Sequence, residues 1–150
     1  NAGGDIRAAG DRGDKLPWTI AVRDPEDKVP SWDNESWQRS IVPDLIQITA
    51  GGVATSGSYE VYFDRDRLAH HIVKGQTGRS PTHAMSVTVA AATTMEADAL
   101  ATAVFVLGPN EGKRLIDELD GCECLIIDRQ GKQARSSGWG GIATSGSKPE

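Results

Sequence analysis

Alternating hydrophobic and polar positions predict a series of short β-strands along the first two thirds of the chain. The strand-like segments are residues 5–9, 18–23, 45–49, 59–63, 68–73 and 85–92. Glycine, proline or runs of charged residues separate them, as is typical of turns and loops. Residues 50–52 (AGG) interrupt the pattern, and residues 53–58 are small and mostly polar. The segment at 85–92 is rich in β-branched residues, so we expect it at the centre of a sheet.

The hydrophobic pattern changes to a helical period beyond residue 93. Residues 96–107 (EADALATAVFVL) predict a helix with acidic residues near its beginning, where the helix dipole favours negative charge. Thr93 or Thr94 is placed to cap its first turn. Gly108 followed by Pro109 is a common way for a helix to end.

The last third of the chain predicts one more helix and one more strand. Residues 110–119 form an amphipathic helical pattern, and residues 124–128 (CLIID) read as a strand. The tail from Gln133 onward is rich in glycine and serine, which predicts loop. Mostly antiparallel strands with two late helices indicate an α+β fold.

Charge restricts the classes of partner. The chain has 150 residues, with 16 Lys and Arg against 21 Asp and Glu, and a net charge of -5. No block rich in lysine or arginine is present, which argues against nucleic acid as a partner. An anionic substrate would need a metal ion or aimed backbone N–H groups to offset its charge.

The two cysteines, Cys122 and Cys124, are separated by one residue. On a strand both side chains point the same way, but such a pair makes a poor disulfide, and two thiols alone do not build a zinc site. We interpret them as two small hydrophobic residues on a late strand.

Asp98 and Thr102 are the first candidates for chemistry. They are four residues apart on the predicted helix, so their side chains share one face. A carboxylate and a hydroxyl are oxygen ligands of the kind that Mg²⁺ prefers. The alternative is that Asp98 only interacts with the helix dipole and that Thr102 bonds back to the i-4 carbonyl. Spacing alone favours that alternative.

Three further segments carry weaker signals. His71 stands where a strand runs into a glycine loop whose backbone N–H groups could face phosphates, although an ordinary hairpin explains the pattern as well. Residues 55–59 (TSGSY) are small and hydroxylated, so that a flat ring could lie close to the backbone. Their alternative is a bulged strand entry. Residues 3–7 (GGDIR) lack the third glycine and the helix of a dinucleotide-binding motif.

The order of these motifs is more specific than any one of them. Along the chain run GGDIR at 3–7, Trp18 with Asp24-Pro25, ATSGSY at 54–59, HI at 71–72 with TG at 77–78, SVTV at 86–89 and ADALATA at 97–103. Together they resemble the ApbE family, the FAD:protein FMN transferases once described as thiamine-biosynthesis lipoproteins. The resemblance covers nearly the whole chain and becomes thinner over 26–44 and after 132.

The resemblance implies a role for each matching residue. Asp98 and Thr102 would be magnesium ligands, which reverses the preference from spacing, and Asp98 would count with His71 as catalytic. His71, rather than His70, would contact FAD or assist proton transfer from the acceptor hydroxyl. The residues that would bind FAD are Asp5, Thr55, Ser56, Gly57, His71, Ile72, Thr77 and Gly78.

The resemblance also implies a T-fold-like α+β fold and an activity. Family members cleave FAD, attach FMN to a threonine of an acceptor protein and release AMP. Lys74-Gly75 depart from the Asp-Pro that is usual in the family, and Gln76 replaces a usual basic residue. These departures leave open a degenerate module that binds FAD without transferring FMN, or a maturation partner of a respiratory reductase.

We expect residues 1–150 to be the C-terminal portion of a single ApbE-like domain. Asn1 begins inside a glycine turn, so the N-terminal half of the domain is expected to be absent from this chain and to act as its partner. Family resemblance places the parent protein in the periplasm or on the inner membrane as a lipoprotein. The acceptor protein is the remaining partner that the resemblance implies.

Overall fold

The computed structural model describes residues 1–13, 15–25 and 44–140, and these residues form an α+β fold. Its elements are β1 (Ile6–Ala8), β2 (Trp18–Ala21), β3 (Leu45–Ile48), β4 (Gly51–Gly57), β5 (Ser86–Ala91), α1 (Thr94–Leu107), α2 (Pro109–Asp117), β6 (Glu123–Ile127) and β7 (Gln133–Arg135). The predicted class, mostly antiparallel strands with two late helices, is therefore confirmed.

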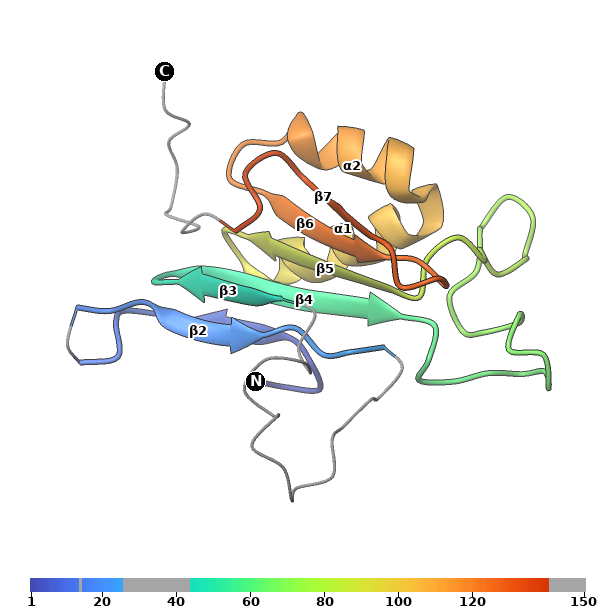
Figure 1. The fold of residues 1–150 in the computed structure, drawn as a ribbon, viewed down its shortest axis with the longest axis horizontal. Coiled ribbons are helices and arrows are strands. Elements are labelled where there is room, and N and C mark those ends of the chain that lie inside the picture. Colours follow the sequence, from blue (N-terminus) through green and yellow to red (C-terminus); the bar gives the residue numbers. More distant parts are fainter. Residues whose placement is uncertain (14, 26–43, 141–150) are drawn as a thin grey trace.

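The described elements stack in three layers (Figure 1). The middle layer is a five-stranded sheet in the order β1-β4-β5-β6-β7, in which every neighbouring pair is antiparallel. Helices α1 and α2 cover one face of this sheet, and the antiparallel pair β2-β3 covers the other. The strand predicted at 85–92 is β5, and it lies in the middle of the sheet as expected.

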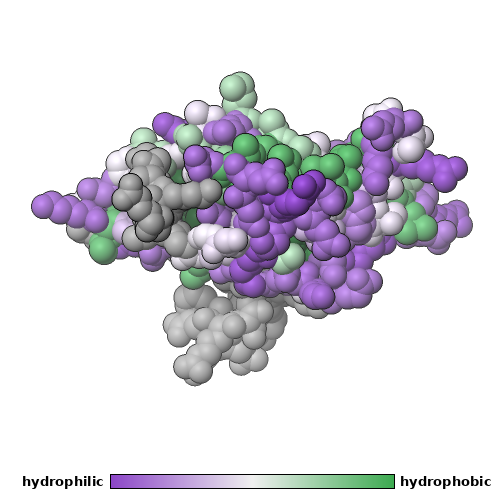
Figure 2. Space-filling model, turned by 90° about the horizontal axis from the view of Figure 1, so that it is seen from above, coloured by the Kyte–Doolittle hydropathy of each residue, from purple (hydrophilic) through white to green (hydrophobic). Residues whose placement is uncertain are grey.

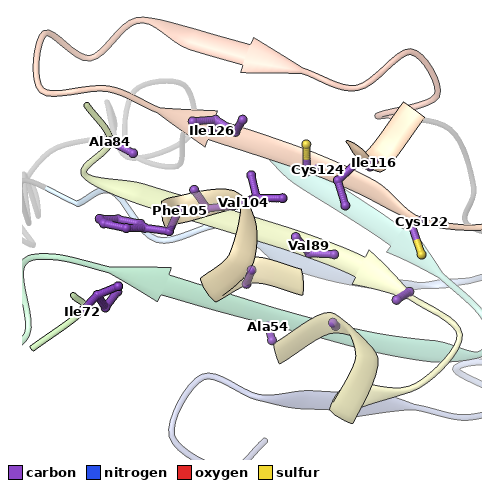
Figure 3. Packing of buried hydrophobic residues seen from close by; sticks show 14 residues of the cluster. Ala54, Ile72, Ala84, Val89, Val104, Phe105, Ile116, Cys122, Cys124 and Ile126 are labelled. Atoms are coloured by element: carbon purple, nitrogen blue, oxygen red, sulfur yellow. The ribbon is translucent and has the colours of Figure 1, made fainter. Parts of the chain in front are cut away.

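Side chains of the central strands alternate between two hydrophobic cores, as the period of a strand requires. Val89 of β5 lies with Val104 and Phe105 of α1 in the core under the helices (Figure 3). Val87, two residues earlier on the same strand, belongs to the same core. Ala90, between the other two layers, belongs to the second core with residues of β2 and β3. All of these positions are fully or almost fully buried.

The first turn of α1 lies directly against β4. Thr93 caps the helix, because its side chain accepts a hydrogen bond from the N–H of Glu96 at 3.2 Å. Thr94 Oγ1 donates to the carbonyl of Ile6. At Gly52 of β4, an added Cβ would lie 2.3 Å from the backbone nitrogen of Thr94. The absence of a side chain at Gly52 is what lets the helix approach this closely.

Three expectations about strands were wrong. The expected break at Gly51 and Gly52 and the small residues up to Gly57 form β4, an interior strand between β1 and β5. Neither 59–63 nor 68–73 forms a strand; they meet only at one isolated bridge between Tyr62 and His70. The small residues of β4 allow α1 to pack closely on the strand, whereas several large residues of the following loop, such as Phe63 and Leu68, are exposed.

The expected loop after Gln133 also contains a strand. Residues 133–135 form β7, which pairs with β6 at the edge of the sheet. Gly131, with a φ of 76°, makes the tight reversal between β6 and β7. The strand is short and polar, so hydrophobic periodicity gave no signal for it.

Both cysteines are buried in the core between the sheet and the helices. Burial raises the pKa of the Cys122 thiol to about 11, and the nearby carboxylate of Glu96 adds to the effect. Burial likewise raises the pKa of Cys124 to about 11. Because the thiolate is the reactive form, these residues act as small hydrophobic side chains, as predicted, although only Cys124 lies on the late strand β6.

The described part of the chain contains no helix long and apolar enough to cross a membrane. Helix α2 carries charged pairs on its solvent side, such as Arg114 with Glu111 at 2.7 Å. The side of the molecule on which α2 lies is largely hydrophilic, with smaller hydrophobic areas between (Figure 2).

Asp44 joins the β2-β3 pair to the end of the large sheet. Its Oδ2 accepts hydrogen bonds from the indole Nε1 of Trp139 at 2.8 Å and from Nε of Arg135 at 3.0 Å. Its Oδ1 accepts from the N–H of Leu45 at 2.9 Å. Burial acts to raise the pKa of Asp44, but these hydrogen bonds and the Arg135 charge outweigh burial and hold the pKa below the ordinary value of 3.8.

The Asp44 carboxylate is therefore expected to stabilise the fold in a pH-dependent way. A depressed folded-state pKa adds stability above the unfolded pKa, and that stability is lost as the pH falls through the folded pKa. We expect Asp44→Asn to lower the unfolding free energy by about 1–2 kcal/mol at pH 7. Below the ordinary carboxyl pKa of about 4 the difference from wild type should shrink.

Urea titrations of both proteins between pH 7 and pH 3 measure this difference. Asp66→Asn, which changes an exposed carboxylate in the loop after β4, is the control. A deficit of Asp44→Asn that stays constant over the whole pH range would contradict the ionic role.

Candidate functional site

The structure distributes the predicted site residues over three places. Ser56 of β4 contacts Thr102 of α1, and Asp98 lies on the same helix. A second group borders a pocket on the opposite face of the sheet, and a third lies in the loop between β4 and β5. The sequence motifs therefore do not all point into a single cavity of the described residues.

The first place is built by β4 and α1. The hydroxyl oxygens of Ser56 and Thr102 are 2.8 Å apart and share a hydrogen bond. Asp98 lies one turn before Thr102 on the same side of α1, and its side chain is exposed. Thr102 therefore connects two oxygen-bearing side chains: it bonds to the buried Ser56 of β4 and shares a helix face with the exposed Asp98.

The alternative explanations for Asp98 and Thr102 lose force in the structure. Helix α1 begins at Thr94, so its first turn holds Glu96 but not Asp98. A dipole interaction falls off within the first turn and does not account for Asp98. The Thr102 hydroxyl bonds to Ser56 of a neighbouring strand, so the i-4 carbonyl of its own helix is not its only possible partner.

Carboxylate and hydroxyl oxygens suit a hard cation, but these side chains alone do not supply a complete set of ligands. No group of three or more His, Cys, Asp or Glu side chains in the described parts of the chain could hold a metal. Mg²⁺ commonly uses one or two carboxylates and takes its other ligands from water and substrate phosphate. Asp98 with the hydroxyl of Thr102 fits that limited protein share, and Ser56 adds a second hydroxyl beside it.

The second place is a pocket of about 510 Å³ on the β2 side of the large sheet. Thr55 and Gly57 of β4 line it together with Thr88 of β5. The hydroxyl oxygens of Thr55 and Thr88 are 2.8 Å apart. At its rim, Arg23 forms an ion pair with Glu60 at 3.0 Å.

Alternation along β4 separates residues that the sequence had grouped. Thr55 faces the pocket, whereas Ser56 faces α1, because successive side chains of a strand point to opposite faces. The flat ring that lies against Gly57 is that of Tyr59, whose Cε1 would be 2.3 Å from an added Cβ. Asp5 sits in the turn beside the pocket but does not line it.

The third place is the loop that carries His71. The His71 side chain is exposed, whereas Ile72 is buried in the core under α1. Its neighbour His70 is fully buried, and the two ring centroids are 6.3 Å apart. The loop thus presents one histidine to solvent and anchors the residues on either side of it.

Thr77 and Gly78 form a tight turn in this loop. The N–H groups of both donate to the carbonyl of Lys74, at 3.1 and 2.8 Å. In this conformation the two N–H groups are satisfied within the loop, as in the ordinary turn that was the alternative to a phosphate-binding loop. The hydroxyl of Thr77 accepts from the N–H of Arg79.

Thr88 is a pocket residue that the sequence reasoning missed. A signal existed, because Ser86 and Thr88 alternate with Val87 and Val89 along β5. This alternation marks the face opposite the helices as polar at two successive positions. The partner of Thr88 is Thr55 of β4, which is the neighbouring strand. This pairing joins residues distant in sequence, and the hydrophobic pattern alone did not predict it.

Comparison with known proteins gives consistent results. The ApbE family model matches residues 1–126. The FAD:protein FMN transferase of Escherichia coli (strain K12) is 35% identical over 133 residues, which cover 87% of this chain and 35% of that protein. The chain thus spans about a third of the length of this curated relative.

Solved structures agree with the sequence match. The crystal structure of the ApbE protein from Thermotoga maritima has a TM-score of 0.72 and 35% identity, and covers 91% of this chain and 41% of that chain. The flavin transferase ApbE from Vibrio cholerae has a TM-score of 0.67 and 31% identity, with 91% and 41% covered. At these sequence identities the solved structures support a shared family as well as a shared fold.

Proposed function

The chain belongs to the ApbE family, and on that premise we propose that it forms part of an enzyme that transfers FMN from FAD to an acceptor protein. The finer proposal is that the acceptor side chain is a threonine, that AMP is released and that the reaction requires magnesium. The names of the relatives support flavin transfer as the reaction class.

The observation that carries the metal requirement is the oxygen cluster of Ser56, Asp98 and Thr102. We propose that Asp98 and Thr102 hold the ion with water and substrate oxygens as further ligands. Bound magnesium would supply charge compensation at the pyrophosphate of FAD. Because Ser56 contacts Thr102 and Thr55 faces away, we assign Ser56 to the pyrophosphate side of the substrate.

We propose that His71 acts as the general base, which accepts the proton of the attacking acceptor hydroxyl. Its exposed imidazole lies in a loop whose flanking residues are buried, so its position is defined while its ring stays accessible. A histidine placed within hydrogen-bond reach of the acceptor hydroxyl can accept its proton as the P–O bond forms. The FMN phosphate then becomes an ester of the acceptor oxygen, and the AMP phosphate leaves with the bridging oxygen.

Calorimetric titration with FAD, with and without Mg²⁺, tests this proposal on the protein that contains this chain. The same samples are incubated with FAD and extract of the source organism, and covalent flavin fluorescence and AMP are measured. We expect FAD binding to require Mg²⁺, and one AMP to appear per flavin attached. Equal FAD affinity without the ion, and no covalent flavin, would favour a degenerate FAD-binding module instead.

A further inference from the structure

We propose that His70 is a positioning residue that fixes His71 relative to α1; this inference rests on the proposed role of His71. His70 is fully buried, although imidazole is a polar group. Its backbone and ring contacts connect the loop on both sides of His71 with the helix that carries Asp98 and Thr102.

The backbone of His70 is held by one side chain across the loop. Its N–H donates to Ser80 Oγ at 2.9 Å, and the Ser80 hydroxyl donates back to its carbonyl at 2.8 Å. The peptide units that flank His70 are therefore fixed next to His71. This closes the base of the loop that contains the Lys74 turn.

The ring of His70 has a defined tautomer. Its Nε2 lies 2.9 Å from the carbonyl oxygen of Pro81, and a carbonyl can only accept, so Nε2 carries the hydrogen. In the neutral ring Nδ1 is then an acceptor, and among the described residues no group donates to it. A buried acceptor without a donor costs free energy, and this cost offsets part of what the Pro81 bond contributes to stability. The benefit of histidine is the directional bond to Pro81.

The ring also connects the loop to α1. It packs edge-on against Phe105 with centroids 5.6 Å apart, and Phe105 lies less than one turn beyond Thr102. On its other sides the ring meets Tyr62 and the ring of His71. A rotation of the His70 ring would therefore be transmitted to His71 and change its distance from the face of α1.

His83 offers a matched control. Its Nε2 lies 3.0 Å from the carbonyl of Phe105, so it also makes an imidazole-to-carbonyl bond at this end of α1. His83 lies two residues after the buried Pro81, outside the loop that the contact between His70 and Ser80 closes. Loss of either bond should affect stability similarly, but only loss of the His70 bond should affect the position of His71.

The experiment compares His70→Phe, His70→Gln and His83→Phe with wild type. We expect His70→Phe to lower kcat for flavin transfer about tenfold through misplacement of His71, with the KM for FAD changed less than about twofold. The amide of glutamine can still donate to Pro81, so His70→Gln should recover most of kcat. His83→Phe should stay within about twofold of wild type.

Hydrogen–deuterium exchange of the amides at 71–78 gives a readout that does not depend on activity. It should rise in His70→Phe and stay at the wild-type level in His83→Phe. Equal exchange or equal kcat in the two phenylalanine variants would overturn the positioning role. If wild type shows no flavin transfer, the proposed function fails while the exchange comparison still decides the role of His70.

Discussion

Gly52→Ala is expected to destabilise the protein by about 3 kcal/mol and to displace the candidate metal ligands of α1, Asp98 and Thr102, at the same time. The new Cβ would lie 2.3 Å from the nitrogen and 2.4 Å from the Cα of Thr94, and 2.5 Å from the carbonyl carbon of Thr93. These are backbone atoms of the helix start and cannot rotate away as a side chain could. Relief therefore requires α1 to move away from β4.

Movement of α1 would act on the site because the contact between Ser56 and Thr102 joins the same two elements. We thus expect Gly52→Ala to weaken FAD binding as well as stability. Guanidinium unfolding measures the first effect and calorimetric FAD titration the second.

Gly75→Ala is the matched control for stability. A Cβ added at Gly75 would have no heavy atom within 4 Å, and this glycine does not have a left-handed φ. Its substitution should change the unfolding free energy by less than about 0.5 kcal/mol. If Gly52→Ala is as stable as Gly75→Ala, the close packing of α1 on β4 is wrong.

The same contact explains which parts of the fold the sequence predicted and which it did not. Helix α1 and strand β5 have long, strongly periodic patterns, so their existence followed from local reasoning. Gly51 and Gly52 looked like a break because glycine weakens strands in general. The reason for Gly52 is the close approach of the start of α1, more than forty residues later in the chain. Gly51 has a φ of 140° and lies against the carbonyl of Ala91 in β5. A local pattern contains neither piece of information.

The opposite error occurred at residues 59–63. Their aromatic and β-branched residues (YEVYF) are typical of a strand, yet Tyr59 covers Gly57 and Tyr62 meets the ring of His70. The two tyrosines pack on different parts of the structure, whereas Val61 and Phe63 are exposed. Pattern alone does not distinguish this arrangement from the face of a sheet.

For the candidate site, spacing was sufficient only within one element. Residues four apart on a helix share a face, so the placement of Asp98 with Thr102 could be predicted. The approach of Ser56 to Thr102, and of Thr55 to Thr88, depends on how β4 packs and pairs. Adjacent residues of the TSG motif consequently ended on opposite faces of the sheet.

Asp98→Asn is expected to lower flavin transfer by about a hundredfold or more while leaving the fold intact, if the proposed function is correct. Asparagine keeps the size and one oxygen of the side chain but removes the charge that would attract the cation. Asp98 is exposed and lies beyond the first turn of α1, so the change should shift the melting temperature by no more than about 2 °C. Initial rates of AMP release over a Mg²⁺ titration measure the effect.

Two further variants separate loss of a ligand from loss of any surface charge. Glu118→Gln removes an exposed carboxylate at the end of α2 and should leave the Mg²⁺ dependence unchanged. Asp98→Cys presents a soft thiolate, which favours Cd²⁺ over Mg²⁺ because thiolates bind soft metals better than hard ones. Partial recovery of transfer by Cd²⁺ in Asp98→Cys, but not in Asp98→Asn, would identify residue 98 as a direct ligand. Equal Mg²⁺ dependence in wild type and Asp98→Asn would instead remove Asp98 from the metal site and leave the hydroxyl pair of Ser56 and Thr102 as a structural contact.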